Sequence, residues 1–248
     1  MLAFRLVVHA LRQLWDNRGA TLRLSLFPGL LWLAFTAGPM LLAGTPQLRI
    51  EGGMAVPLVA AGLLGIILYV VMAVAWHRHV LLDEPARLSG DGRWRQVLAY
   101  LGRMGMIMLA VVPALIAAVV LLSMLLTVAM QSGGQPAWIA AIAFVISVLL
   151  TALLLRLLTV LPGAALRHSR PWGAAWAATK GRARTFLLLG LVMTGAQTLL
   201  PNVTGLVATA SLTLAVLVHA VLSWVGALIA LSLMTTLWGH FVEGRALR

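Results

Sequence analysis

The stretch LVAAGLLGIILYVVMAVAWHRHVLLDEPAR, residues 58–87, decides the class of this chain. A long apolar run is followed by a Trp, two His, an Arg and then two carboxylates. An α-helix needs about 20 apolar residues to cross roughly 30 Å of hydrocarbon, so the run predicts a transmembrane helix. The polar residues after it have two interpretations: the start of a catalytic or metal site, or the place where the helix leaves the membrane.

The composition extends this prediction to the whole chain. Of its 248 residues, 62% are hydrophobic and 10% are charged, whereas a soluble domain carries about 25% charged residues. The apolar runs lack the alternation that is typical of membrane β-strands. We therefore predict an all-α, polytopic membrane helix bundle that forms a single domain over residues 1–248. The predicted spans are residues 24–43, 54–76, 104–130, 138–161, 186–207 and 212–238.

The basic residues predict how this bundle is oriented. The chain carries 18 Lys and Arg against 6 Asp and Glu, a net charge of +12. If the N-terminus is cytoplasmic, all of these Lys and Arg fall on the cytoplasmic side except Arg49, outside, and Arg156, within a span. Because short loops rich in Lys and Arg stay cytoplasmic, we expect a bacterial inner-membrane protein with both termini in the cytoplasm. Anionic lipid head groups, and not nucleic acids, are the expected partners of this charge.

Residues 1–23 contain too many polar residues to span a membrane. Arg5, His9, Arg12 and Asp16 follow the spacing of one helix face, and most of the remaining side chains are apolar. This pattern is typical of an amphipathic helix that lies in the membrane interface.

Two further segments of similar composition, residues 93–103 and 171–184, each precede an apolar hairpin. The pairs Arg12-Gln13 and Arg95-Gln96 are 83 residues apart. One interpretation is a threefold repeat of an interfacial helix followed by two spans. The other is a chance resemblance between arginine-rich amphipathic helices, and the sequence leaves both open.

Small residues predict where the spans approach one another, since lipid provides no hydrophobic drive between helices. They recur at helical spacing in three spans: Ala61 and Gly65; Gly190 and Thr194; and Ala220, Ser223, Ala227 and Ala230. We also expect Pro201 and Asn202 to end or kink the fifth span, because Pro removes a helical hydrogen bond.

Signals of enzymatic chemistry are missing from the sequence. All six Asp and Glu fall outside the predicted spans, there is no Cys, and no nucleotide-binding, serine-hydrolase or zinc-protease motif occurs. We therefore expect no enzyme activity, no cofactor and no metal. In a helix, His77 and His79 lie about 200° apart and do not share a metal ion. The favoured interpretation of this segment is an interfacial anchor, with Trp76 at the membrane boundary and Arg78 reaching lipid phosphates.

Two polar residues fall within the predicted spans. Arg156 lies six residues before Pro162, or about 9 Å along a helix, so its side chain either reaches the cytoplasmic face or holds a lipid phosphate or a carbonyl inside the bundle. His219 is either a packing residue hydrogen-bonded to a neighbouring helix or part of a translocation route. The residues expected to contact lipid or a partner are Arg156, His219, Trp76, Arg78, Trp94, Arg95, Trp172, Trp176, Lys180 and Arg182.

One region resembles a loose group of bacterial six-span inner-membrane proteins, which includes the membrane region of some glycerophosphodiester phosphodiesterases. The resemblance is carried by R-x5-P, at Arg156 and Pro162, and by A-W-x-x-T-x-G, at Ala175, Trp176, Thr179 and Gly181. It implies the six-span architecture and an association with lipid. The soluble phosphodiesterase domain of those enzymes has no counterpart in this sequence, so the resemblance does not imply their activity.

Taken together, these patterns predict a non-enzymatic membrane protein that acts as an accessory or scaffold subunit of a membrane assembly, or that associates with lipid. The alternative is a transporter or flippase for a lipid-like or apolar molecule, which would use the pseudo-repeat with Arg156 and His219. The sequence leaves the particular partner, the substrate and the oligomeric state open.

Overall fold

The computed structural model describes residues 1–43, 55–90, 92–131, 137–166 and 172–247. Within these ranges every regular element is an α-helix, and six helical segments are long and apolar enough to cross a membrane. The predicted class, an all-helical chain with six candidate spans, is confirmed. The helices are α1 (Leu2–Asp16), α2 (Arg18–Ala43), α3 (Ala55–Leu82), α4 (Arg93–Gln131), α5 (Ala137–Leu158), α6 (Leu161–Ala165), α7 (Trp172–Ala178), α8 (Ala183–Ala208) and α9 (Leu212–Phe241).

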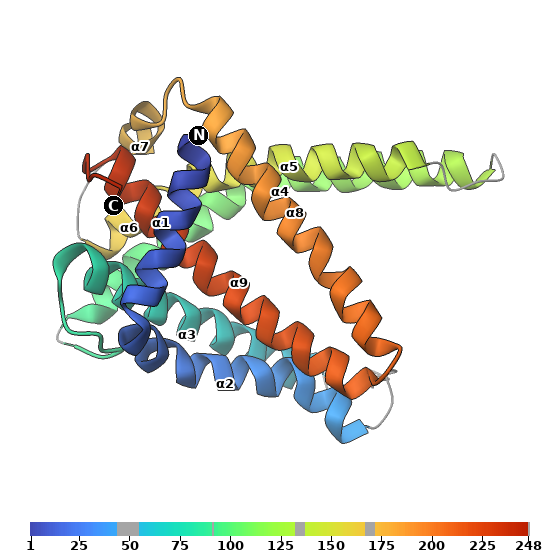
Figure 1. Ribbon diagram of the computed structural model, residues 1–248, viewed down its shortest axis with the longest axis horizontal. Coiled ribbons are helices and arrows are strands. Elements are labelled where there is room, and N and C mark those ends of the chain that lie inside the picture. Colours follow the sequence, from blue (N-terminus) through green and yellow to red (C-terminus); the bar gives the residue numbers. More distant parts are fainter. Residues whose placement is uncertain (44–54, 91, 132–136, 167–171, 248) are drawn as a thin grey trace.

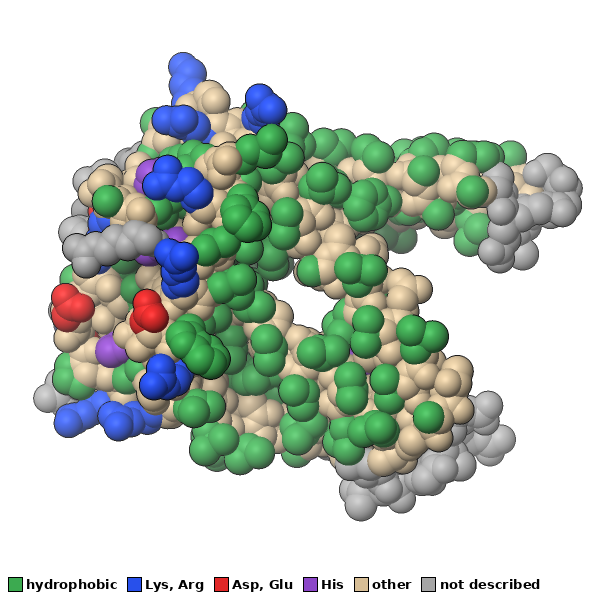
Figure 2. Space-filling view, viewed as in Figure 1, with side chains coloured by type: hydrophobic (Ala, Val, Ile, Leu, Met, Phe, Trp, Pro, Cys, Tyr) green, Lys and Arg blue, Asp and Glu red, His purple; other side chains and the backbone are tan. Residues whose placement is uncertain are grey.

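The short helices and both ends of the chain gather at one end of the molecule (Figure 1). We call this the polar end; it comprises α1, α6, α7, residues 83–90, the C-terminal residues 242–247 and the ends of the long helices that adjoin them. Figure 2 shows basic, acidic and His side chains concentrated here, whereas the rest of the visible face is mostly hydrophobic. On this face the charged side chains thus lie mostly at one end of the molecule; Arg49 lies outside the described residues.

The long helices form three hairpins, α2–α3, α4–α5 and α8–α9, that extend from the polar end (Figure 1). The α4–α5 hairpin projects away from the other two, and α8 contacts α5 near the polar end before it diverges toward the start of α9. Large apolar side chains cover the projecting hairpin; Leu109 is 78% exposed and Met124 is 64% exposed.

The best-packed core lies toward the polar end. One cluster joins α3, α4, α6 and α9 and includes Met72, Tyr100 and Leu161. A second joins α1, α5, α8 and α9 and includes Leu6 and Leu237. Helix α1 is therefore part of the packed structure, because its buried face lies against α8 and α9.

Several boundaries differ from the sequence prediction. Helix α2 begins at Arg18, because only Asn17 separates it from α1, and the predicted interfacial helix 1–23 therefore divides between the two. Residues 93–103 are the first turns of α4, whose 39 residues measure about 58 Å at 1.5 Å per residue. We expected Pro201 and Asn202 to end or kink the fifth span; the prediction of an end is wrong, since α8 continues to Ala208. One missing hydrogen bond does not break a helix whose other backbone bonds persist in lipid.

Candidate functional site

The two histidines of the opening stretch have separate structural partners. His77 is fully buried between α3, α4 and α9, with Nδ1 2.8 Å from Thr235 Oγ1 and Nε2 3.4 Å from the Tyr100 hydroxyl. Because the Thr235 hydroxyl donates to the Leu231 carbonyl at 3.0 Å, it accepts from His77 Nδ1–H, and Nε2 then accepts from Tyr100. This buried relay ties three helices together.

His79 faces the segment that follows α3. Its Nδ1 lies 2.6 Å from the backbone carbonyl of Glu84, so this nitrogen carries the donated proton. Within the described residues, no three His, Cys, Asp or Glu side chains are placed to hold a metal ion.

Trp76 does not have the exposed position that an anchor at the membrane boundary requires. Trp76 is 2% exposed and belongs to the main core, because α3 is surrounded by other helices at this level; the boundary-anchor prediction for it is wrong. Arg78 binds both carboxylate oxygens of Glu84 and donates from Nη1 to the Ala165 carbonyl at 2.9 Å. Its guanidinium therefore closes the loop after α3 and fastens it to α6.

The pair at the start of α4 has the exposure that an interfacial role requires. Trp94 is 56% exposed, and Arg95 is also exposed. Both lie at the polar end, in the first turn of a helix whose opposite face is buried through Val97 and Tyr100.

Arg156, at the end of α5, is held by α7. Its Nε donates to Thr179 Oγ1 at 2.9 Å and its Nη2 to the Trp176 carbonyl at 3.2 Å. The guanidinium carbon lies 3.4 Å from the centre of the Trp176 ring, a cation–π contact. We call this arrangement, together with Lys180 and Arg182, the Arg156 corner.

The local sequence explains why this corner forms. Pro162 lies in the first turn of α6, where its missing N–H leaves no hydrogen bond unmade. The Thr179 hydroxyl donates to the Ala175 carbonyl at 2.9 Å and so presents its oxygen to Arg156. Gly181 turns the chain with φ +75°, which favours glycine. The separated R-x5-P and A-W-x-x-T-x-G motifs thus form one structural unit.

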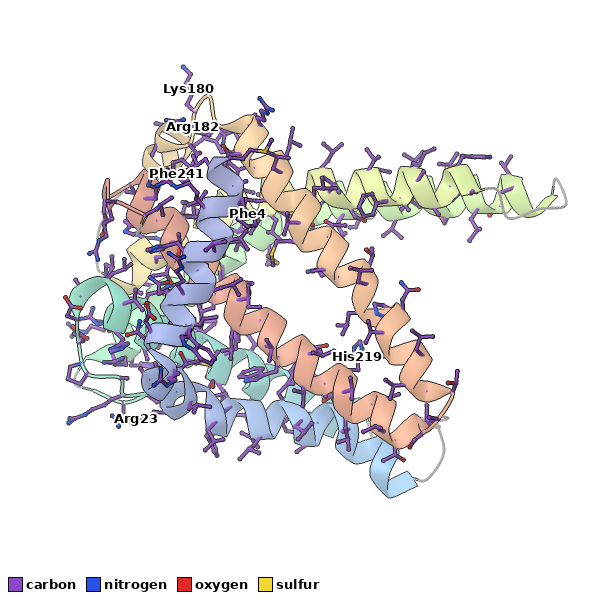
Figure 3. All side chains as sticks on the ribbon, in the orientation of Figure 1. Phe4, Arg23, Lys180, Arg182, His219 and Phe241 are labelled. Carbon is purple, nitrogen blue, oxygen red and sulfur yellow. The ribbon has the colours of Figure 1, made fainter. Side chains whose placement is uncertain are left out.

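An apolar pocket adjoins the guanidinium. It has a volume of about 220 Å³ and is lined by Arg156, Leu157, Val160, Gly173 and Trp176. Lys180 and Arg182 are exposed close by and point outward from the polar end (Figure 3). Trp172 begins α7, but its side chain lies outside the part of the chain that the structure describes.

His219 lies far from this corner. It is exposed on α9 and faces the space between α9 and α8 (Figure 3), where it lines a cavity of about 350 Å³ with residues of α2 and α8. The expected hydrogen bond to a neighbouring helix is not found among the described residues. The structure therefore brings together Arg156 and Trp176, with Lys180 and Arg182 exposed just after α7, and leaves His219 apart.

The sequence patterns identified the cation and the aromatic ring of the corner but missed the pocket lining. Leu157 and Val160 are ordinary apolar residues of a span in the sequence, and only the fold of α7 back onto α5 gives them this position. Compared with known protein families, with curated proteins and with solved structures, the chain has no match.

Proposed function

We propose that this chain is a non-enzymatic inner-membrane protein that binds anionic phospholipid at the Arg156 corner. The observation that carries the proposal is the stacking of Arg156 on a half-exposed Trp176 at the edge of an apolar pocket. A phospholipid presents the matching chemistry, a phosphate joined to hydrocarbon.

The donors of Arg156 support this assignment. A guanidinium has five N–H groups, and the contacts to Thr179 and Trp176 use only its Nε and one Nη2 hydrogen among the described residues. The remaining donors are available to phosphate oxygens. Lys180 and Arg182 add long-range attraction of about 1 kcal/mol each near an anionic surface.

The proposed membrane placement has both termini in the cytoplasm and α1 in the cytoplasmic interface. Helix α1 exposes an apolar stripe of Phe4, Leu11 and Trp15 beside its polar stripe, while a third face packs on α9. An apolar stripe at the level of charged side chains fits the boundary between head groups and acyl chains. The threefold repeat belongs to this proposal, with α1, the start of α4 and α7 as its interfacial elements.

The test is lipid retention by the purified protein. We expect native mass spectrometry in mild detergent to show phosphatidylglycerol bound in preference to phosphatidylcholine. Arg156→Gln should weaken this binding about five- to tenfold, since it removes the charge and the stacking contact.

The matched control is Arg23→Gln, because Arg23 is an exposed basic residue elsewhere at the polar end. If Arg156→Gln folds poorly, the double variant Lys180→Gln/Arg182→Gln replaces it in the lipid-retention experiment. Equal retention of phosphatidylglycerol by the wild type, the corner variants and the control would refute the assignment.

A second candidate, an accessory subunit of a membrane assembly, is supported by the α4–α5 hairpin. This hairpin stands apart from the other spans and exposes apolar side chains along its length. A protein partner would cover that face through close packing. Copurification with defined partners in mild detergent tests this candidate, and a monomer that carries only lipid argues against it.

A further inference from the structure

A polar cleft lies at the polar end, between α1, the end of α3 and the end of α9. It consists of two cavities of about 480 and 410 Å³ that share His9, Gln13, Val80 and Asp83 as lining residues. Its charged side chains are Arg12, Asp16, Asp83 and Arg245. None of these residues belongs to the Arg156 corner.

The walls of the cleft are fixed by hydrogen bonds. Ser232 Oγ on α9 lies 2.8 Å from both the Ala10 carbonyl oxygen and Gln13 Oε1, which holds α1 against α9. On the opposite side, Arg245 Nη2 donates to the Leu81 carbonyl at 2.6 Å, which ties the C-terminal segment to the end of α3. A cleft with walls held in this way binds a ligand with little loss of conformational freedom.

Asp83 lies in the wall with an unusual backbone conformation. It has φ +54°, in the left-handed region, directly after the last residue of α3. Asp and Asn adopt this region more readily than other non-glycine residues. The residue type therefore both ends the helix and places a carboxylate on the lining of both cavities.

One buried polar group of the cleft has no partner in the described structure. Thr236 is 3% exposed, it is one of the residues that line the larger cavity, and its Oγ1 makes no hydrogen bond among the described residues. A buried hydroxyl without a hydrogen-bond partner destabilises the folded protein. A ligand in the cleft would supply the missing hydrogen bond.

The charges of the cleft indicate the kind of ligand. The lining carries charges of both signs, the guanidinium groups of Arg12 and Arg245 and the carboxylates of Asp16 and Asp83, and Arg245 Nε is also paired with Glu243 at 2.7 Å. A ligand that carries a single charge is attracted by the lining groups of one sign and repelled by those of the other. A zwitterion that carries phosphate and ammonium together satisfies both signs, with hydrogen bonds from guanidinium to phosphate and from ammonium to carboxylate.

We propose that the polar cleft binds a zwitterionic phosphoamine group, the chemistry shared by free phosphoethanolamine and the head group of phosphatidylethanolamine. This site is separate from the Arg156 corner and does not depend on anionic lipid binding there. Helix α1, with its exposed apolar stripe beside the cleft residues Arg12 and Asp16, lies at the level where such head groups occur.

The experiment has one arm for each source of the ligand. In detergent, isothermal titration calorimetry compares phosphoethanolamine with phosphocholine, which has the same charges but no ammonium N–H. In nanodiscs, the thermal unfolding midpoint is compared between phosphatidylethanolamine and phosphatidylcholine. Preference for the primary amine in the first arm supports binding of the free compound, and preference in the second arm alone supports binding of the lipid.

The variants locate the effect in the cleft. Asp83→Asn keeps a side chain that tolerates the left-handed backbone but removes the charge, and Arg12→Gln changes an exposed residue of α1. Each substitution should reduce the preference for the primary amine over the quaternary amine about tenfold. Arg5→Gln, on the same helix but outside the cleft lining, should not change it.

Thr236→Val separates binding from stability. Because the hydroxyl has no partner, the free protein should be equally stable or more stable with Val, while the ligand should bind more weakly. The proposal is overturned if neither arm shows a preference for the primary amine, or if Asp83→Asn and Arg12→Gln behave like Arg5→Gln. Arg156→Gln should leave this preference intact, so failure at the Arg156 corner is distinguishable from failure here.

Discussion

The polar end and the α4–α5 hairpin have the same helical secondary structure but opposite packing. At the polar end, α3, α4, α6 and α9 bury Met72, His77 and Tyr100 almost completely. In the hairpin, by contrast, the most apolar 18-residue stretch of α4 contains no buried residue. The two regions differ in what surrounds each helix, and much less in how apolar the helices are.

This difference shows where the specificity of the fold resides. The hydrocarbon chains of lipid surround an apolar helix as favourably as neighbouring helices do. A helix that faces lipid therefore needs no protein partner. At the polar end, the buried relay of His77, Tyr100 and Thr235 has strict geometric requirements. We therefore expect substitutions at the polar end to destabilise the fold, and comparable substitutions on lipid-facing surfaces to be tolerated.

The largest expected effect is at a close contact between the backbones of α8 and α5. A Cβ atom on Gly190 would lie 2.6 Å from the Val148 carbonyl oxygen and 3.0 Å from the Ala152 nitrogen, both backbone atoms. Gly190→Ala should lower the free energy of unfolding by about 3 kcal/mol, the upper part of the range for overpacking. Detergent-induced unfolding of the purified protein measures this change.

Gly65→Ala is the matched control. The sequence pattern assigns Gly65 the same role as Gly190, yet a Cβ on Gly65 meets nothing within 4 Å. We expect equal or slightly greater stability, because Ala favours the helix more than Gly does. Equal destabilisation by the two substitutions would contradict the contrast between packed and lipid-facing surfaces.

The second effect concerns the buried relay. His77→Leu removes the partner of the Tyr100 hydroxyl and one partner of Thr235, so two buried polar groups lose hydrogen bonds. The expected loss is about 2 kcal/mol. Its measurement is the same unfolding experiment, combined with Tyr100→Phe; the double variant should lose less than the sum of the single losses.

The chain provides a control for the loss of a histidine. His219 lies in α9, like Thr235, but is exposed and makes no hydrogen bond among the described residues. His219→Leu should leave stability unchanged within about 0.5 kcal/mol. A loss as large as that of His77→Leu would show that the space between α8 and α9 is a packed interface.

The six spans were predictable because lipid imposes one requirement, apolar length, that each helix meets alone. Boundaries were less predictable. Helix α4 continues from residue 93 through the predicted junction at 103–104, and α8 continues past Pro201, because backbone hydrogen bonding outweighs the local signals. Among the small residues, Gly190 and Gly65 look alike in sequence, but another helix lies against Gly190 and nothing lies within 4 Å of a Cβ on Gly65.

The candidate sites show the same limit. Arg156 and Trp176 were recognisable as an intramembrane cation and an amphipathic aromatic residue, but their contact depends on how α7 folds onto α5. Trp76 was misassigned because an aromatic residue at the end of an apolar run looks the same whether lipid or protein surrounds it. The polar cleft combines residues from α1, α3 and α9, and no spacing within the sequence relates them.

The smallest expected effect tests whether the loop after α3 belongs to the packed region. Glu84 binds Arg78 through both carboxylate oxygens and lies 3.7 Å from Arg93, and the side chains of Arg78 and Arg93 are only 15% and 13% exposed. Glu84→Gln should cost about 1 kcal/mol, because the arginines stay largely buried with a weaker partner. Glu243→Gln is the matched substitution, since Glu243 pairs with Arg245, whose side chain is 48% exposed. The Gln carbonyl oxygen can still accept the hydrogen bond that Trp238 Nε1 donates to Glu243 Oε1 at 2.6 Å, so the substitution should cost about 0.3 kcal/mol. Salt separates the two further: 0.5 M NaCl should remove the effect at Glu243 and leave most of that at Glu84, since screening acts mainly on exposed pairs. Equal, fully screened effects would place the Arg78–Glu84 pair in free solvent and remove the loop from the packed polar end.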